Sequence, residues 1–245
     1  MQPLSTGGLL RAWELGGSEP RRVDRAMALL EAGYPDVPRP TLAKLSIGER
    51  DSLLLALRDQ IFGPRLTALA VCPGCGERLE LAFESADVRT DRKQDADQLL
   101  NLRLEDYEIT FRTPNSLDLA ALAEKGDIRD KKQALLLSVI SQARYRGAET
   151  EPTQLPEAVI AAIEDRLEQA DPQAEVQLNL SCAACGHASQ ALFDIVSFFW
   201  SEVDTWAVRL LREVHTLARA YGWREADILA MSPGRRLRYL EMLSG

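Results

Sequence analysis

Two short stretches decide how this chain folds: Cys72-Pro73-Gly74-Cys75-Gly76 and Cys182-Ala183-Ala184-Cys185-Gly186. Both have the form C-x-x-C-G, and together they hold the 4 cysteines of the 245-residue chain. One tight turn of this form supplies two thiolates, and zinc prefers four such ligands at the corners of a tetrahedron. The glycine after each second cysteine can adopt a left-handed conformation that turns backbone N–H groups toward the sulfurs. The pattern therefore predicts one structural zinc ion per chain, bound by Cys72, Cys75, Cys182 and Cys185.

The residues on either side of each cysteine turn alternate between apolar and polar side chains, as they do in short strands. Arg65–Val71 (RLTALAV) and Arg78–Phe83 (RLELAF) flank the first turn, and Glu175–Leu180 (EVQLNL) and Ser189–Phe193 flank the second. Each pair of segments predicts an antiparallel hairpin with the cysteine turn at its tip. Two such hairpins would form a zinc ribbon, although 106 residues separate Cys75 from Cys182.

A redox-active pair and unpaired core thiols are the other interpretations of these cysteines. A thioredoxin-like pair needs a single C-x-x-C at the start of a helix, whereas this chain has two such turns, each between strand-like segments. His187 could replace a cysteine as ligand, but the symmetry of the two turns makes it redundant, so we expect it beside the site rather than in it. Four thiolates leave no open coordination position, so the zinc is expected to be structural rather than catalytic.

The overall composition is that of a soluble globular protein, with 46% apolar and 27% charged residues. The chain has 37 acidic and 29 basic residues, which gives a net charge of −8. Nucleic acid is therefore an unexpected partner, because a negative chain is repelled by phosphate backbones. No signal peptide is visible, and the longest apolar runs, such as Leu53–Leu57, are shorter than the about 20 residues that span a bilayer. We therefore expect a cytoplasmic protein without membrane contact, and in that reducing compartment cysteines favour metal over disulfides.

The pattern of apolar residues predicts an α+β protein, mainly helical, with a zinc ribbon formed by the two distant C-x-x-C-G hairpins. Its expected parts are an N-terminal helical region (1–65), the zinc ribbon (66–84 plus 174–194), a helical insertion with one strand (85–173) and a C-terminal helical docking segment (195–245). The clearest early helices are Arg21–Glu31 and Ile47–Phe62, the second of which begins with a Ser46/Glu49 capping box.

The remaining predicted elements follow from periodicity and from turn residues. We expect a strand at Tyr107–Arg112 and loops at Tyr34–Pro40 and Tyr145–Gln154. Helices are predicted at Ser116–Glu124, Lys131–Ala143, Pro156–Ala170, Phe198–Ala220, Glu225–Ala230 and Gly234–Leu243.

No arrangement of residues in the sequence predicts an enzyme. The only histidines, His187 and His215, are far apart, and the chain contains no G-x-S-x-G, P-loop or G-x-G-x-x-G motif. The main alternative function is a zinc-ribbon/helix-turn-helix nucleic-acid-binding regulator, in which the last helix would present arginines to DNA. The simpler interpretation is that Arg235, Arg236 and Arg238 pair with nearby carboxylates or with an acidic partner protein. The expected carboxylates are Glu225, Asp227 and Glu241.

One segment resembles a known family. Leu45–Glu84 (LSIGERDSLLLALRDQIFGPRLTALAVCPGCGERLELAFE) is similar to the T4-type phage baseplate (hub) protein family, in which a helix "R-x-x-L-L-L-x-L-R-x-x-x-F-G" runs into a strand and a C-P-x-C-G turn. The matching residues are Arg50, Leu53–Leu55, Leu57, Arg58, Phe62, Gly63, Cys72, Pro73, Cys75 and Gly76. The tail, with Tyr221–Trp223 and Ser232–Arg236, also resembles proteins encoded with contractile tails and phage-like contractile injection systems.

This resemblance implies a non-enzymatic structural or assembly component of a contractile tail baseplate. Such a protein would fold in the cytoplasm of a bacterial host, bind other baseplate and tail proteins, and either join the particle or leave it after assembly. The aromatic and arginine side chains of the C-terminal segment suggest where a partner binds, because these residue types dominate interfaces. We expect the partner-binding residues to be Phe198, Phe199, Trp200, Trp223, Arg235, Arg236 and Tyr239.

Overall fold

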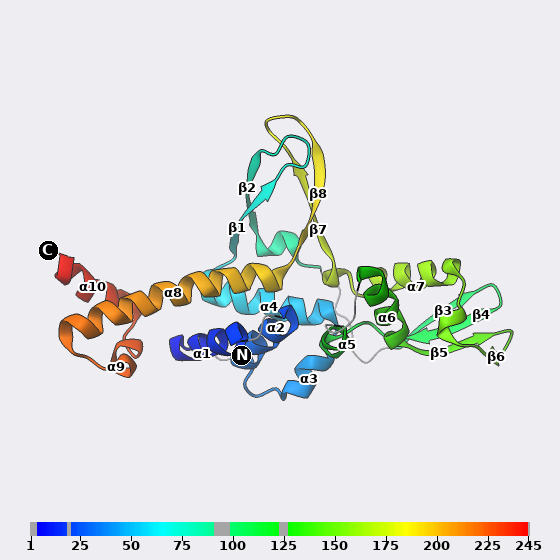
Figure 1. The fold of residues 1–245 in the computed structure, drawn as a ribbon, viewed down its shortest axis with the longest axis horizontal. Helices are drawn as coiled ribbons and strands as arrows, with labels where there is room; N and C mark the ends of the chain where they lie inside the picture. The colour runs from blue at the N-terminus through cyan, green and yellow to red at the C-terminus, as the bar shows by residue number, and fades with distance from the viewer. Residues whose placement is uncertain (1–3, 19–20, 91–98, 123–126, 245) are drawn as a thin grey trace. The chain divides into compact units, whose positions relative to one another are not determined.

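The computed structural model describes residues 4–18, 21–90, 99–122 and 127–244, and it divides the chain into two compact units (Figure 1). Unit 1 combines Met1–Asp36 with Val196–Gly245, and unit 2 is Val37–Ile195. The predicted N-terminal region 1–65 is therefore shared between the two units. No helix in the described ranges has the length and apolar character that a membrane span requires.

Unit 1 is helical and is organised around the long helix α8. Its apolar stripe, predicted from the sequence, is buried at Phe199, Val203, Leu210, Val214 and Leu217. Leu10 of the first helix and Ile228 of a later one complete a core with this stripe. The helices of the unit are α1 (Thr6–Ser18), α2 (Arg22–Gly33), α8 (Ile195–Tyr221), α9 (Glu225–Leu229) and α10 (Pro233–Ser244).

Unit 2 carries the two predicted hairpins and a separate antiparallel sheet. The first hairpin is β1 (Arg65–Val71) with β2 (Arg78–Glu84), and the second is β7 (Val176–Ser181) with β8 (Ala188–Phe193). The sheet has the order β3-β4-β5-β6. Its strands are β3 (Leu100–Leu104), β4 (Tyr107–Phe111), β5 (Ile140–Tyr145) and β6 (Ala148–Glu149). The helices of the unit are α3 (Arg39–Lys44), α4 (Ile47–Phe62), α5 (Ser116–Ala121), α6 (Ile128–Val139) and α7 (Glu157–Ala170).

The prediction of one strand between the hairpins is wrong, because the described part of 85–173 contains four. The predicted helix Lys131–Ala143 ends at Val139, and Ile140–Ala143 belong to β5. Pairing with β4 and burial in a core cluster that includes residues of α7 outweigh the helical pattern. The predicted loop Tyr145–Gln154 holds β6 and a short 3-10 helix, Pro152–Gln154. The predicted loop Tyr34–Pro40 ends earlier, since α3 begins at Arg39 with proline in its first turn. Ala123 and Glu124 of the predicted helix Ser116–Glu124 lie outside the described residues.

A buried carboxylate joins the start of α4 to the start of the second hairpin. The capping box is confirmed: Glu49 N–H donates to Ser46 Oγ at 3.1 Å, and Ser46 N–H donates to Glu49 Oε2 at 2.9 Å. Next to it, Gly48 N–H donates to Asp171 Oδ2 at 2.8 Å. A carboxylate is favourable at a helix N-terminus, where backbone N–H groups have no partner within the helix. Asp171 thereby holds the chain that enters β7 against the helix that leads to β1.

A second contact joins the end of the first hairpin to the beginning of the second. The buried Gln173 donates from Nε2 to the backbone oxygen of Val88 at 2.9 Å and accepts from the N–H of Thr90 at 2.8 Å. On the same side, the fully buried Arg58 of α4 donates to the backbone oxygens of Gly63 and Arg65, which fixes the entry into β1. The bases of both hairpins are therefore held by hydrogen bonds that do not involve the cysteines.

Asp51 in α4 is a buried carboxyl group whose protonation changes the stability of unit 2. Burial raises the pKa of Asp51 to about 6; the Arg50 guanidinium at 2.7 Å opposes the rise, and the charges of Asp194 and Asp171 add to it. Because an unfolded aspartate has a pKa near 3.9, the native state keeps a proton that the unfolded state loses between about pH 4 and pH 6. The contribution of Asp51 to stability is therefore present at low pH and is lost as the pH rises through 6.

We expect the free energy of unfolding of the wild-type protein to rise by roughly 2 kcal/mol relative to that of Asp51→Asn as the pH falls from about 7 to about 4. Urea unfolding of the two proteins at a series of pH values measures this difference, and any effect common to both, such as loss of metal in acid, cancels. A difference that stays constant across the series would show that the carboxyl group titrates normally.

Candidate metal centre

The first cysteine turn, residues 72–76, closes the tip of the first hairpin with two backbone hydrogen bonds. Cys72 N–H donates to the oxygen of Glu77 at 2.9 Å, and Gly76 N–H donates to the oxygen of Cys72 at 2.9 Å. Gly76 has a φ of +77°, so the prediction of a left-handed glycine at this position is confirmed. A residue with a Cβ would be strained at this position.

The second cysteine turn, residues 182–186, has the same two backbone hydrogen bonds as the first. Cys182 N–H donates to the oxygen of His187 at 3.0 Å, and Gly186 N–H donates to the oxygen of Cys182 at 2.8 Å, with a φ of +73° at Gly186. Each turn therefore places one buried cysteine, Cys72 or Cys182, ahead of an exposed one, Cys75 or Cys185. Two different stretches of sequence have converged on the same local geometry.

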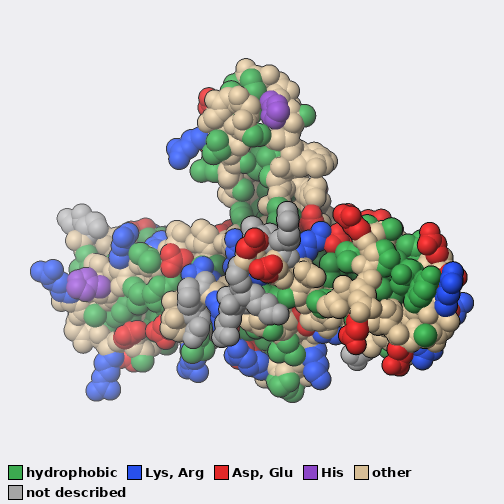
Figure 2. All heavy atoms as spheres, turned by 45° about the vertical axis from the view of Figure 1, so that its right-hand side comes forward, with side chains coloured by type: hydrophobic (Ala, Val, Ile, Leu, Met, Phe, Trp, Pro, Cys, Tyr) green, Lys and Arg blue, Asp and Glu red, His purple; other side chains and the backbone are tan. Residues whose placement is uncertain are grey.

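The two hairpins lie side by side (Figure 1). Alternate residues of each strand are buried or half-buried, and Phe83 meets Phe193 edge to face with ring centroids 5.6 Å apart. The outward-facing residues Leu69, Val71 and Leu192 are more than half exposed, and hydrophobic side chains are visible on the surface of the hairpins in Figure 2. The buried or half-buried positions are Leu66, Ala68, Ala70, Leu79, Leu81, Phe83, Val176, Leu178, Leu180, Ser189, Ala191 and Phe193.

The four thiol groups meet where the tips of the hairpins come together. Cys72 Sγ lies 3.7 Å from Cys185 Sγ, Cys75 Sγ lies 3.7 Å from Cys182 Sγ, and all four sulfurs lie within 4.8 Å of one another. Four sulfurs placed about 2.3 Å from a central zinc in a tetrahedron would be about 3.8 Å apart. A disulfide would need a separation of about 2.0 Å. The arrangement therefore fits a four-coordinate metal ion and not a pair of disulfides.

As free thiols, Cys182 and Cys75 have very different pKa values. Backbone N–H groups of Cys185 and Ala184 lower the pKa of Cys182 to about 7, against the opposing effect of burial. At Cys75 the backbone near Glu77 favours the thiolate, but hydrogen bonds with the neighbouring thiols and burial raise its pKa to about 12. A metal ion must therefore displace protons from this cluster, which makes its affinity depend on pH.

His187 lies beside this cluster, as expected from the sequence. A Cβ built on Gly74 would come within 3.1 Å of Cγ of His187, so the imidazole of the second turn rests against the backbone of the first. Among the described residues, the group with metal-binding spacing consists of the four cysteines, and His187 is not in it. A methyl group at position 74 would therefore press against this imidazole.

The structure corrects the expected exposure of the partner-binding residues. Phe199 and Trp200 are buried, and Trp200 packs so closely on α1 that a Cβ on Gly16 would lie 2.6 Å from its ring. Arg236 is buried as well, with Nε donating to Glu213 Oε2 at 2.9 Å and Nη1 donating to the oxygen of Met231 at 2.7 Å. Surface remains at the half-buried Phe198, Trp223 and Tyr239 and at the exposed Arg235.

Sequence reasoning did not find the residues that hold the bases of the hairpins, Gly48, Asp171 and Gln173. Asp171-Pro172 indicates the end of a helix, but nothing in the sequence says that its carboxylate reaches a helix N-terminus 123 positions away. The capping box at Ser46 was the one available signal, since it marks an end where unpaired N–H groups attract an acceptor.

The fold and the thiol cluster define an α+β protein whose two hairpins, distant in sequence, meet at a four-cysteine centre. A family model described as T4 bacteriophage base plate protein matches residues 27–200, which include α4, both hairpins and all four cysteines. The chain belongs to this family, and the resemblance seen at Leu45–Glu84 is confirmed. The other resemblance, at Tyr221–Trp223 and Ser232–Arg236, lies outside the matched residues. Searches of curated proteins and of solved structures found no match.

Proposed function

We propose that this protein is a non-enzymatic structural or assembly component of a contractile-tail baseplate, as in phages and phage-like contractile injection systems. The observation that carries the proposal is the family match over residues 27–200, which covers the entire cysteine centre. Family membership supports a structural role in a phage tail, and interaction with other tail proteins follows from such a role. The hairpins then serve as a rigid support, and the binding surfaces lie on the elements around them.

The metal in this proposal is one structural zinc ion per chain, bound by Cys72, Cys75, Cys182 and Cys185. Sulfur–sulfur distances of 3.7 Å support it, as does the matched geometry of the two turns. With four thiolates bound, zinc would have no free position for water or substrate, so its role would be to join the two hairpins. The zinc would then join the two hairpins at their tips, in addition to the hydrogen bonds of Asp171 and Gln173 that hold their bases.

The environment of the C-terminal arginines supports the baseplate proposal over the nucleic-acid-binding alternative. A recognition helix needs arginines that are free to reach base edges and phosphates. Arg236 is buried against Glu213, and Arg238 Nη1 lies 3.0 Å from Glu241 Oε2 on the same helix. Pairing of these arginines with carboxylates is what the simpler interpretation of the sequence expects. Glu241 is one of the carboxylates that it names, whereas Glu213 is not.

The part of the C-terminal segment that reaches the surface remains our proposal for a partner-binding surface. It comprises Phe198, Trp223, Arg235 and Tyr239, of which Trp223 stacks on Tyr221 with centroids 4.5 Å apart. Arg235 lies over the ring of Tyr239 at 5.8 Å, which leaves a cation on an aromatic platform. Such clusters of aromatic residues and arginine are enriched at the energetic centres of interfaces.

Deletion of the gene in its bacterial or phage background tests the proposal. Complete contractile tails should disappear from electron micrographs, and the wild-type gene supplied in trans should restore them. Mass spectrometry of purified particles then separates a resident subunit, present in each particle, from an assembly factor that has left. Normal numbers of complete tails in the deletion strain would refute the proposed function, and binding to duplex DNA at physiological salt would favour the alternative.

A further inference from the structure

One edge of strand β5, in the sheet of unit 2, is paired with a neighbouring strand along only part of its length. β5 pairs with β4 from Ile140 to Tyr145, but β6 pairs only with Arg144 and Tyr145. The two strands are joined by the two-residue turn Arg146-Gly147, in which both residues have positive φ. Within the described sheet, Ile140–Gln142 therefore have no strand beside them on the β6 side, over a length of about 10 Å.

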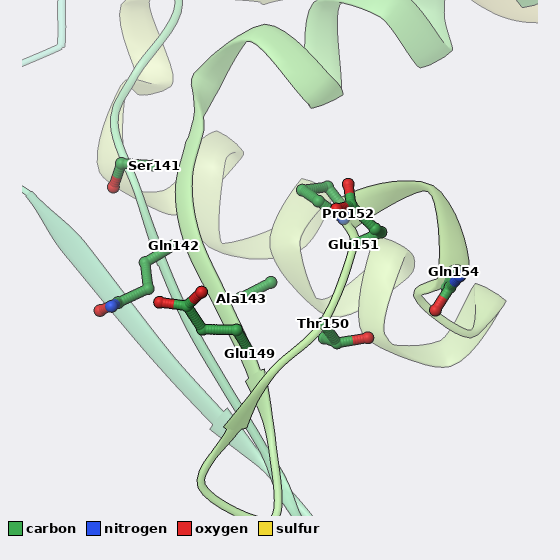
Figure 3. A pocket seen from close by; sticks show the side chains of 8 residues that line it. All are labelled: Ser141, Gln142, Ala143, Glu149, Thr150, Glu151, Pro152 and Gln154. Atoms are coloured by element: carbon green, nitrogen blue, oxygen red, sulfur yellow. The ribbon is translucent and has the colours of Figure 1, made fainter.

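The chain leaves the sheet at this point and opens a pocket. Thr150 N–H donates to the oxygen of Ala143 at 3.0 Å, and the segment then turns away into Pro152–Gln154 (Figure 3). The space between β5 and the departing segment is a pocket of about 400 Å³. It is lined by Ser141, Gln142, Ala143, Glu149, Thr150, Glu151, Pro152 and Gln154.

The lining of this pocket is acidic. Glu149 and Glu151 are exposed, and no lysine or arginine is among the lining residues. Acidic side chains are also spread over the surface of this part of the molecule in Figure 2. A second copy of the chain, which would bring the same two carboxylates to the contact, is disfavoured by like-charge repulsion. A segment with lysine or arginine at alternate positions is favoured, because strand pairing places such side chains on one face.

We propose that the open edge of β5 at Ile140–Gln142 is a docking site for an extended, positively charged segment of another protein. The segment of the partner protein adds to the sheet as a strand beside β5. Main-chain hydrogen bonds then provide affinity, and Glu149 and Glu151 select basic side chains. Pro152 keeps the segment 150–154 from continuing as a strand, since proline lacks the N–H that a ladder requires. This surface lies outside the cysteine centre and outside the C-terminal segment, and it goes beyond the proposed function.

The test uses the isolated, isotope-labelled full-length chain and a seven-residue peptide that alternates lysine and valine. Nuclear magnetic resonance should show the backbone amides of residues 140–143 shifting on titration, with an affinity that falls as salt is added. Two control peptides have the same length: in one glutamate replaces lysine, and in the other the backbone nitrogens of alternate residues are methylated. Both should bind at least tenfold more weakly, because one has the wrong charge and the other lacks donors.

Variants of the pocket complete the test. The charge reversal Glu149→Lys/Glu151→Lys should weaken binding of the lysine peptide at least tenfold. The neutral variant Glu149→Gln/Glu151→Gln should weaken it less. The control Asp165→Lys/Glu168→Lys changes the charge to the same extent at two exposed positions of α7 and should leave peptide binding unchanged. Absence of binding at millimolar peptide, shifts confined to other strands, or equal binding of the methylated peptide would overturn the proposal. None of these results depends on whether the protein enters a baseplate.

Discussion

Replacing Cys72 and Cys185 together with serine should abolish zinc binding and lower the melting temperature of the hairpin-bearing unit by at least about 10 °C. This pair takes one thiolate from each hairpin, so the two cysteines that remain cannot complete a tetrahedral site. Structural zinc contributes on the order of 10 kcal/mol to the folding of small modules. Even half of that, roughly 5 kcal/mol, corresponds to a shift of about 10 to 20 °C for a protein of this size. Calorimetry with elemental analysis of the same samples measures both effects.

The matched control for this experiment lies in the same turn. Ala183→Ser/Ala184→Ser introduces two hydroxyl groups at exposed positions and leaves all four thiols in place. It should retain one zinc per chain and melt within a few degrees of the wild type. If the double cysteine variant were well folded, free of metal and as stable as the wild type, the zinc would have no structural role.

The substitution Gly48→Ala should lower the free energy of unfolding by roughly 3 kcal/mol, because overpacking a buried contact forces the neighbouring atoms apart. A Cβ at this position would lie 2.0 Å from Oδ1 of Asp171 and 3.0 Å from the backbone nitrogen of Ala174. Asp171 would have to leave the N-terminus of α4, and the start of β7 would move with it. Urea unfolding measures the loss of stability, and competition with a chelator should show faster release of zinc.

Gly17→Ala provides the control for this prediction. Gly17 is also helical, but a Cβ there meets no atom within 4 Å, so the substitution should be neutral or stabilise the protein by up to about 1 kcal/mol. In a Gly48→Ala/Asp171→Ala double variant the clash is gone, so the two losses should not add. Wild-type stability of Gly48→Ala would mean that the contact between α4 and Asp171 does not hold the second hairpin.

Local patterns in the sequence were enough to predict the elements that carry the candidate metal centre. The helix Ile47–Phe62, with its capping box, is found with the predicted bounds, and strand Arg65–Val71 likewise. These segments are recognisable because alternation, caps and turn glycines act over a few residues. The equivalence of the two C-x-x-C-G turns indicated that both would have the same geometry, which the hydrogen bonds bear out.

The rest of the fold depends on contacts between residues that are far apart in the chain. The change from helix to strand at Val139 and Ile140 is decided by pairing with β4, which no local preference reveals. The burial of Trp200 depends on α1, where Gly16 leaves room for the indole ring. For the same reason the C-terminal aromatic residues could not be divided into core and surface by sequence alone.

X-ray absorption at the zinc edge of the purified protein would show whether one zinc ion joins the two hairpins. We expect one zinc per chain, surrounded by four sulfur atoms at about 2.3 Å and by no nitrogen or oxygen. Absence of zinc from the protein as isolated, or a shell in which nitrogen or oxygen replaces sulfur, would contradict it.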